Sequence, residues 1–419
     1  MKFLAIALQQ RCFLVLVLFL TIASASGQTT NPSADSVRIG LLTMGPGRQF
    51  FERFGHDALI VLDRANGQAI SYNFGYFDPS ERDFIPRFLR GQMQYALVAL
   101  PLKDDLDQYE QEGRSARLQW LRVTPAEADR LASDLARLSR PEFAHYHYDY
   151  LTANCATKVR DALDRALNGT IAPQLTGLSP GQTYRKRILA LAAADPWMAI
   201  LLDIGLGPSA DQPLTQWQEA FLPMQFAHHL TQLHTANGHA LVQQTTQLLA
   251  QQIAIPATHT QHRWLWLIGL ISAAILVGLA RRPRLSAVIA AVIWLICTLA
   301  GWLLLLLWLF TAHRVTWMNA NLLLFNPLCL VAMADIGRMW KGQAPTAMIL
   351  TVHWLIACTC LAALAVHGIQ TYPQDNMVWI SLIAPLHCVQ ALLRQNARNR
   401  AARGTSPISD RTVIASSPP

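Results

Sequence analysis

One cysteine stands apart from the other cysteines of the chain and is the residue best suited to nucleophilic chemistry. Of the seven cysteines, Cys12 lies in the apolar N-terminal segment, five lie in long apolar runs, and only Cys155 lies in the polar region between them. It follows Asn154 at the expected start of a helix, and Lys158 and Arg160 come soon after. The free N–H groups of a helix N-terminus and nearby cations lower the pKa of a thiol. The position favours a reactive thiolate, although a small buried core cysteine remains the simpler alternative.

A thiolate nucleophile needs a base, and His56 is the best-placed candidate. It opens the apolar segment 57–63 directly after Gly55, and a small residue there leaves room for another group to approach. Asn73, on the strand expected next, is suited to orient the imidazole through its second ring nitrogen. Both residues also have a structural interpretation, because His56 fits a hydrogen-bonded core histidine and Asn73 fits a turn-capping residue.

The other histidines before the long apolar runs are weaker candidates. His145 and His147 alternate with tyrosines, which favours aromatic packing. Four more lie in a stretch rich in Gln, His and Thr and are expected on a solvated surface: His228, His229, His234 and His239. These histidines form no convincing ligand set, and Cys155 has no neighbouring cysteine, so we expect no metal and no cofactor.

Short strands and helices must position these side chains. A turn at Asn66-Gly67 separates two of the strands. Thr124-Pro125-Ala126-Glu127 predicts a capped helix that runs to about residue 138, and helical spacing of apolar residues predicts another from Asn154 onward. Strands are expected at 37–43, 57–63, 70–74, 94–100 and 116–123.

The composition places the chain in the membrane class, because 52% of its residues are hydrophobic and only 14% are charged. Residues 1–26 resemble a secretory signal peptide, with positive charge, a short apolar core and Ala23-Ser24-Ala25 for cleavage; a retained anchor is the alternative. Lys and Arg gather in alternate loops between the later runs, which predicts an exported N-terminal domain and a cytoplasmic C-terminus. The five apolar runs are 264–280, 286–310, 320–336, 346–367 and 377–393.

These features divide the chain into five parts. A signal peptide is expected at 1–26, an exported thiol domain at 27–223, a helical connector at 224–262, a transmembrane domain at 263–395 and a cytoplasmic tail at 396–419. The formal net charge of +8 lies largely beside the apolar runs. That placement is typical of membrane topology and does not indicate nucleic-acid binding.

The order of the motifs resembles the permuted branch of the papain-like superfamily. Phe54-Gly55-His56-Asp57 precedes Tyr72-Asn73-Phe74-Gly75, and Asn154-Cys155-Ala156-Thr157 follows. That branch includes lecithin–retinol acyltransferase and relatives of the NlpC/P60 hydrolases. Over about residues 36–395 the chain is similar to the Lnb-type bacterial lipoprotein N-acyltransferase family, including Gly207–Asp211 and the stretch His313–Pro327. Lys158 departs from the family's expected arginine, which keeps the charge but loses the bidentate fork and leaves this side chain's role open.

The resemblance implies a fold, a reaction and a place in the cell. The fold is an α+β, permuted papain-like exported domain followed by an α-helical membrane domain of about five spans. The reaction moves an acyl chain from a membrane phospholipid through a Cys155 thioester to the N-terminal amine of a lipoprotein, with His56 as base and Asn73 as its orienter. The enzyme would be a multi-pass protein of the bacterial inner membrane with a periplasmic catalytic domain. The expected substrate-binding residues are Tyr72, Asn154, Arg160, His313 and Asn321.

Two other functions remain open at this point. A cysteine peptidase or amidase acting on cell-wall peptides would use the same thiol chemistry, but it would not need a membrane domain of five spans. A non-enzymatic envelope protein that binds lipid would keep the thiol only for structure. The polar residues at membrane depth, among them His313, Asn319, Asn321 and Asn326, fit helix capping as well as lipid binding.

Overall fold

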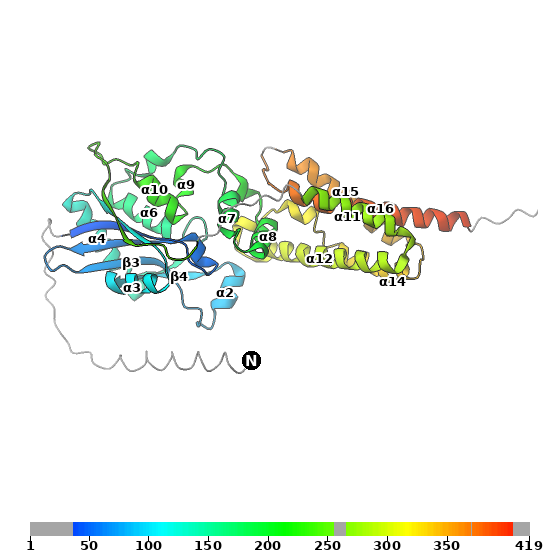
Figure 1. Ribbon diagram of the computed structural model, residues 1–419, viewed down its shortest axis with the longest axis horizontal. Helices are drawn as coiled ribbons and strands as arrows, with labels where there is room; N and C mark the ends of the chain where they lie inside the picture. Colours follow the sequence, from blue (N-terminus) through cyan, green and yellow to red (C-terminus); the bar gives the residue numbers. More distant parts are fainter. Residues whose placement is uncertain (1–36, 255–264, 370, 405–419) are drawn as a thin grey trace, which may run out of the picture.

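A computed structural model describes residues 37–254, 265–369 and 371–404. The chain folds into an elongated molecule with a sheet-containing domain at one end and a helical domain at the other (Figure 1). The expected signal peptide at 1–26 and most of the expected cytoplasmic tail lie outside the described residues.

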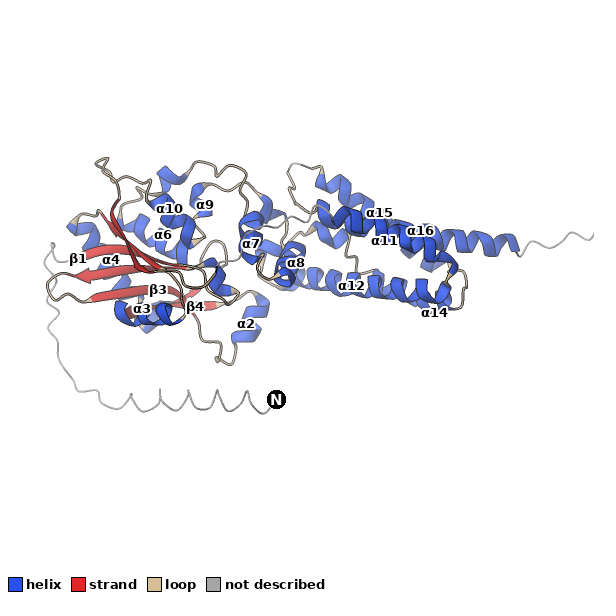
Figure 2. Ribbon diagram, in the orientation of Figure 1, coloured by secondary structure: helices blue, strands red, loops and turns tan. Residues whose placement is uncertain are grey.

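The first domain is built on a seven-stranded antiparallel sheet with the order β6-β4-β3-β2-β1-β5-β7 (Figure 2). The five strands expected from the sequence are all present, each within about two residues of its expected ends, and the turn at Gly67 joins two of them. The strands are β1 (Val37–Met44), β2 (His56–Asp63), β3 (Ala69–Tyr76), β4 (Gln94–Pro101), β5 (Ala116–Leu121), β6 (His145–His147) and β7 (Val242–Leu249).

Helices cover both faces of this sheet. On one face, α4 (Pro125–Leu138), α6 (Cys155–Ala166) and α10 (Pro223–Leu230) bury a core against β1, β2 and β3. On the other face, α3 (Leu102–Gln111) packs on a smaller apolar cluster. The remaining helices of this domain are η1 (Phe51–Phe54), α2 (Phe84–Arg90), α5 (Pro141–Ala144), η2 (Ala172–Leu175), α7 (Tyr184–Ala192), α8 (Pro196–Gly205), η3 (Pro208–Asp211) and α9 (Gln216–Glu219).

The two predicted helix starts are confirmed by their caps. Thr124 accepts from the backbone N–H of Glu127, and the Glu127 side chain accepts from the Thr124 N–H. Asn154 and Thr157 form the same reciprocal pair at the start of α6. Each cap satisfies N–H groups that a helix leaves unpaired, which fixes the first turn.

The helical connector expected at 224–262 is wrong over 231–254, and its residues 255–262 lie outside the described part of the chain. Helix α10 ends at Leu230, and Val242–Leu249 forms strand β7 on the outer edge of β5. The Gln- and Thr-rich sequence shows only weak helical periodicity, whereas β5 offers an unpaired row of backbone N–H and C=O groups. Strand pairing therefore decided the conformation of this segment.

The second domain is helical, and three of its described helices are long and apolar enough to cross a membrane. These are α12 (Pro283–Phe310), α15 (Ala347–His367) and α16 (Met377–Gly404). Helix α16 continues through Pro385 and extends beyond the last apolar run, 377–393, into the basic segment that follows it. The first run supplies the shorter helix α11 (Leu265–Gly278), followed by η4 (Leu279–Arg281).

The third apolar run, 320–336, does not form the continuous span that the sequence predicted. It breaks into short helical pieces, and Asn326-Pro327 lies between two of them. Asn326 Oδ1 accepts from the N–H of Leu328, so the side chain replaces a helical backbone bond at this point. The pieces, with the preceding turn, are η5 (Arg314–Thr316), η6 (Ala320–Leu323), α13 (Cys329–Ala332), η7 (Met333–Asp335) and α14 (Ile336–Trp340).

Candidate active site

Cys155 is the first residue of α6, and the cap places its side chain at the edge of the sheet. Asn154 Oδ1 accepts from Thr157 N at 2.9 Å, and Asn154 Nδ2 donates to the carbonyls of Tyr150 and Phe221. The Asn154 side chain is therefore fully engaged and buried. Its predicted substrate-binding role does not fit this arrangement; the residue positions the helix that carries the thiol.

Cys155 approaches strand β3 closely at Gly75. A Cβ atom added to Gly75 would lie 3.7 Å from the Cβ of Cys155 and 3.9 Å from the Tyr146 hydroxyl. Gly75 has φ +99° at an irregularity of the β3–β4 pairing, a conformation that L side chains rarely adopt. The bulge and the glycine together open the space beside the partly exposed thiol.

The thiol is not the low-pKa group that the sequence predicted. Burial, and to a smaller extent the nearby Asp57 carboxyl, raise the pKa of Cys155 to about 12. Backbone N–H groups of Asp57, Ala156 and Cys155 lower it, as a helix N-terminus should, but they do not outweigh burial. Cys155 is a neutral thiol at neutral pH in this structure, so it needs a base to become a nucleophile.

His56 belongs to a chain of hydrogen bonds that runs across the sheet to α3. Its Nε2 lies 3.0 Å from Asn73 Oδ1. Asn73 Nδ2 donates to Ser71 Oγ at 3.1 Å and to Asp105 Oδ2 at 2.7 Å, and Ser71 Oγ also donates to Asp105 at 2.5 Å. The predicted pairing of His56 with Asn73 is therefore present in the structure, and Asp105 anchors it.

This chain of bonds assigns the tautomer of His56. An ionised carboxylate only accepts hydrogen bonds, so the amide nitrogen of Asn73 must face Asp105 and its oxygen must face His56. The oxygen can only accept, so His56 Nε2 carries the hydrogen. Nδ1 is then the basic nitrogen of the neutral ring.

The electrostatics of the pocket keep His56 neutral. Burial lowers its pKa below the usual 6.5, while the hydrogen bond that His56 donates to Asn73 and the charge of Asp105 raise it, and Arg114 lowers it. The net shift is downward, so the imidazole is unprotonated at neutral pH. A neutral imidazole with a free Nδ1 has the properties that a general base requires.

Strand β2 passes close to Cys155 immediately after His56. The N–H of Asp57, the residue after His56, lies close enough to the sulfur of Cys155 to stabilise its charged form. The hydrogen bonds of the described residues do not include one between His56 and Cys155 themselves. Catalytic hydrogen bonds are often long without substrate and tighten when it binds.

Three polar residues of this site were missed by sequence reasoning. Ser71 shares a face of β3 with Asn73, so the two-residue period of a strand was a usable signal. Asp105 is one of several acidic residues in its helix, and nothing in the sequence distinguished it. Tyr146 was not singled out as a candidate; its ring contacts Phe74 and lies 4.6 Å from the Lys158 ammonium, and its buried hydroxyl has no hydrogen-bond partner among the described residues.

Two of the predicted substrate-binding residues belong to the core instead. Tyr72 alternates with Asn73 along β3, so its side chain points to the opposite face and is buried in the main core cluster. Arg160 is buried against Trp217, with its guanidinium carbon 3.8 Å from the ring centroid and a bond to the Trp217 carbonyl.

The two predicted residues of the membrane domain have different outcomes. Asn321 is completely buried; its Nδ2 donates to the Ile204 carbonyl and its Oδ1 accepts from Asn376. It therefore joins the two domains rather than facing a substrate. His313 lies at the domain junction, where its ring stacks on Tyr150 with centroids 6.0 Å apart.

The described residues include one group with the spacing of a metal site. Cys297, Cys329 and His387 place their ligand atoms within 4.8 Å of one another, and all three are buried in the membrane domain. Two thiols and an imidazole suit a soft cation. Sequence spacing could not indicate this group, because its three members come from three different helices. The group contributes nothing to the site around Cys155.

The chain matches two family models that together cover both domains. One, described as the Lnb N-terminal periplasmic domain, matches residues 26–189, and the other, described as the Lnb transmembrane domain, matches residues 256–398. No curated protein and no solved structure matches the chain significantly.

Proposed function

Because the chain belongs to the Lnb family, both of whose domains it contains, we propose that it is a lipoprotein N-acyltransferase with a papain-like thiol site. The observation that carries the proposal is the pairing of His56 with Asn73 on two strands, β2 and β3, that both pass close to Cys155 at Asp57 and Gly75. The pairing leaves Nδ1 of a neutral imidazole available as the base. Papain-like enzymes need the same three functions: a helix-borne thiol, a strand histidine and a side chain that orients it.

In the first half-reaction, the thiol attacks an acyl ester of a membrane phospholipid. His56 Nδ1 takes the proton from Cys155 as sulfur bonds to the carbonyl carbon. The ester C–O bond then breaks, the imidazolium returns the proton to the departing oxygen, and the acyl chain remains as a thioester. Since Asn154 occupies the N–H of Thr157, the N–H groups of Cys155 and Ala156 are the donors available to stabilise the oxyanion.

In the second half-reaction, an amine replaces the sulfur. The N-terminal α-amine of a lipoprotein attacks the thioester carbonyl, His56 takes the amine proton, and the C–S bond breaks. The product is an amide on the lipoprotein, and Cys155 regains its proton from the imidazolium. The raised pKa of the thiol is compatible with this cycle, because the proton moves during attack and no standing thiolate is required.

The membrane domain supports this choice over a soluble substrate. Helices α12, α15 and α16 are long and apolar enough to cross a bilayer, and the loops rich in Lys and Arg alternate along the sequence. We assign the protein to the bacterial inner membrane, with the thiol domain in the periplasm and the C-terminus in the cytoplasm. A reporter fused after Pro213 should then read periplasmic and one fused after Arg403 cytoplasmic; the opposite result at Arg403 would refute the topology.

The direct test is the N-terminus of a lipoprotein in cells. Mass spectrometry should find an amide-linked acyl chain on the lipoprotein cysteine when the wild-type protein is present, and a free amine when it is absent or carries Cys155→Ala. Release of wall peptides without lipoprotein acylation would favour the cysteine peptidase or amidase. Unchanged acylation with Cys155→Ala would leave only a structural or lipid-binding role.

A further inference from the structure

Helix α2 is attached to the end of a membrane-spanning helix. The carbonyl of Arg90, its last residue, accepts from the N–H of Ala312 at 2.7 Å, two residues beyond the end of α12. The next residue, Gly91, has φ +70°, and a Cβ there would lie 2.8 Å from the His313 nitrogen. These contacts hold α2 where α12 leaves the apolar part of the bilayer.

This short helix exposes apolar side chains although it belongs to the water-facing domain. Leu89 and Ile85 are 62% and 58% exposed, and Phe88 is also exposed. Arg82 and Arg90 flank them on the surface, and neither side chain has an ion pair among the described residues. Apolar residues bordered by arginines are typical of a helix that lies in a membrane interface.

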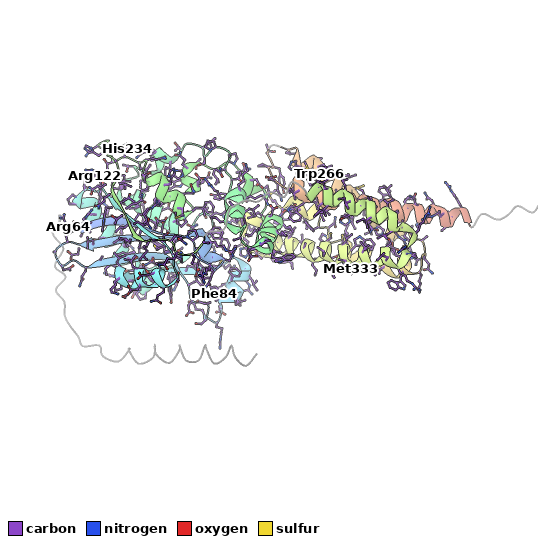
Figure 3. The ribbon with its side chains drawn as sticks, in the orientation of Figure 1. Arg64, Phe84, Arg122, His234, Trp266 and Met333 are labelled. Atoms are coloured by element: carbon purple, nitrogen blue, oxygen red, sulfur yellow. The ribbon has the colours of Figure 1, made fainter. Side chains whose placement is uncertain are left out.

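Figure 3 places Phe84 of α2 at the end of the domain that adjoins the membrane helices, whereas Arg64, Arg122 and His234 lie at the other end. A bilayer around α12, α15 and α16 would therefore lie close to α2, as it would to α8, which Figure 1 draws nearer to α12. Arginines beside apolar residues suit such a surface, because the guanidinium groups can pair with lipid phosphates while the apolar side chains enter among the acyl chains.

A closed circuit of seven aromatic rings connects α2 to the neighbourhood of the thiol. Successive ring centroids are 4.2 to 6.4 Å apart. The circuit runs through Phe88, Phe84, Phe77, Tyr95, Tyr148, Tyr150 and His313, and back to Phe88.

A small cleft between the two domains is lined by three rings of this circuit. Its lining includes Met93, Tyr148 and Tyr150 from the thiol domain and His313 and Arg314 from the membrane domain. On the inner side of the circuit, Tyr95 is paired across β4 and β6 with Tyr146. A Cβ on Gly75 would lie 3.9 Å from the Tyr146 hydroxyl and 3.7 Å from the Cβ of Cys155, so the inner side of the circuit lies near the thiol. The outer side is α2, so one continuous aromatic surface joins the bilayer face to the reaction site.

We infer that α2 is an interfacial helix and that the aromatic circuit behind it is the entry site for a glycerophospholipid of the periplasmic leaflet. The lipid phosphate would lie among Arg82, Arg90 and Arg314, and its ester would pass along the rings toward Cys155. The identity of this ligand as acyl donor rests on the proposed function. The contact of α2 with the bilayer does not rest on the proposed function, because it is inferred from the position and exposure of the helix.

Photo-crosslinking tests the contact with lipid independently of catalysis. The full-length protein, reconstituted in vesicles of phosphatidylethanolamine and phosphatidylglycerol, would carry a photoreactive amino acid at position 85 or 89. Lipid adducts should form at both positions and should be at least ten times rarer at position 178, where Leu178 is 63% exposed on the same domain. Equal labelling at 89 and 178 would overturn the interfacial placement of α2.

A pair of acyl donors tests the entry role. Leu89→Asp should slow thioester formation from vesicle phospholipid by about ten-fold or more, because a charge at this depth opposes insertion. Acylation of Cys155 by a small water-soluble ester should stay within two-fold of wild type, and the matched control Leu178→Asp should change neither rate. Equal loss with both donors, or no loss with phospholipid, would contradict an entry role. If the wild-type protein forms no thioester with any donor, the proposed function fails while the crosslinking result still decides the lipid contact.

Discussion

The molecule contains two buried hydrogen-bond networks built around asparagine side chains. They differ in whether one polar side-chain atom is left without a hydrogen-bond partner. At the domain junction, Asn319 Nδ2 bonds to three carbonyls at the end of α8, and its Oδ1 accepts from Gln374. Asn321 is engaged on both sides as well. In the thiol domain, Asn73 is equally engaged, but the chain of bonds ends at His56, whose Nδ1 stays free.

This contrast separates a structural network from a chemical one. A satisfied buried network holds elements in one arrangement and has no capacity left for a substrate. A network that fixes the orientation of one titratable group and leaves one of its atoms free can move a proton. Mutations in the thiol-domain network should therefore change activity, whereas mutations in the junction network should change stability.

The largest effect is expected from the reactive pair. Cys155→Ala should abolish acyl transfer, and His56→Ala should lower it by at least about 10³-fold, because a nucleophile and its base act as a unit. Both proteins should accumulate in the membrane at wild-type levels. Cys358→Ala, which removes an exposed cysteine of α15, is the matched control and should keep full activity.

The next effect is expected from the residue that orients the base. Asn73→Ala should lower activity by roughly 10- to 100-fold, the range found for partners that fix the orientation of a histidine ring. The thiol and the imidazole both remain, so the activity should be reduced but measurable. A loss as complete as that of His56→Ala would show that Asn73 does more than orient the ring.

A smaller and more specific effect is expected from Asp105. His56 acts as a base when it is neutral, so activity should rise with pH through its pKa, which burial places below 6.5. The charge of Asp105 raises that pKa. Asp105→Asn removes the charge, so the acid limb of the pH–rate profile should move to lower pH. Asp104→Asn, an exposed neighbour on the same helix, should leave the profile unchanged; a shift with both variants would point to a general charge effect.

The smallest effect on catalysis is expected from the junction network. Asn321→Ala leaves a buried carbonyl and the Asn376 amide without partners, which should destabilise the protein by about 1–3 kcal/mol and lower its melting temperature. Activity per folded molecule should stay within about two-fold of wild type. If Asn321→Ala slows thioester formation in protein that is still folded, the junction also takes part in the reaction and the comparison fails.

The sequence predicted the thiol domain well where local signals agreed. The strand pattern, the capped helix after Thr124 and the cap at Asn154 were all readable, because each depends on neighbours in the chain. His56 and Asn73 were found for the same reason, since they lie on adjacent strands of a hairpin whose register the turn fixes.

The remaining errors arose where distant segments decided the outcome. Strand β7 formed because β5 had a free edge, and the third apolar run broke where the buried Asn321 found partners in α8 and at Asn376, just before α16. The pKa of Cys155 was misjudged because burial and Asp57 came from outside the helix that carries it. The role of Asp105 could not be predicted from the sequence, because only the packing of α3 on the sheet brings its carboxylate to Asn73.

The most direct test of the account is the mass of the intact protein after exposure to its proposed donor. The purified wild-type protein, incubated with phospholipid and no amine acceptor, should gain the mass of one acyl chain. Hydroxylamine should remove it, and peptide mapping should place it on Cys155. His56→Ala protein should gain the adduct at least about 10²-fold more slowly, the scale of general base catalysis. No adduct on wild-type protein, or an adduct that persists in Cys155→Ala, would contradict the assignment of Cys155 as the acyl carrier.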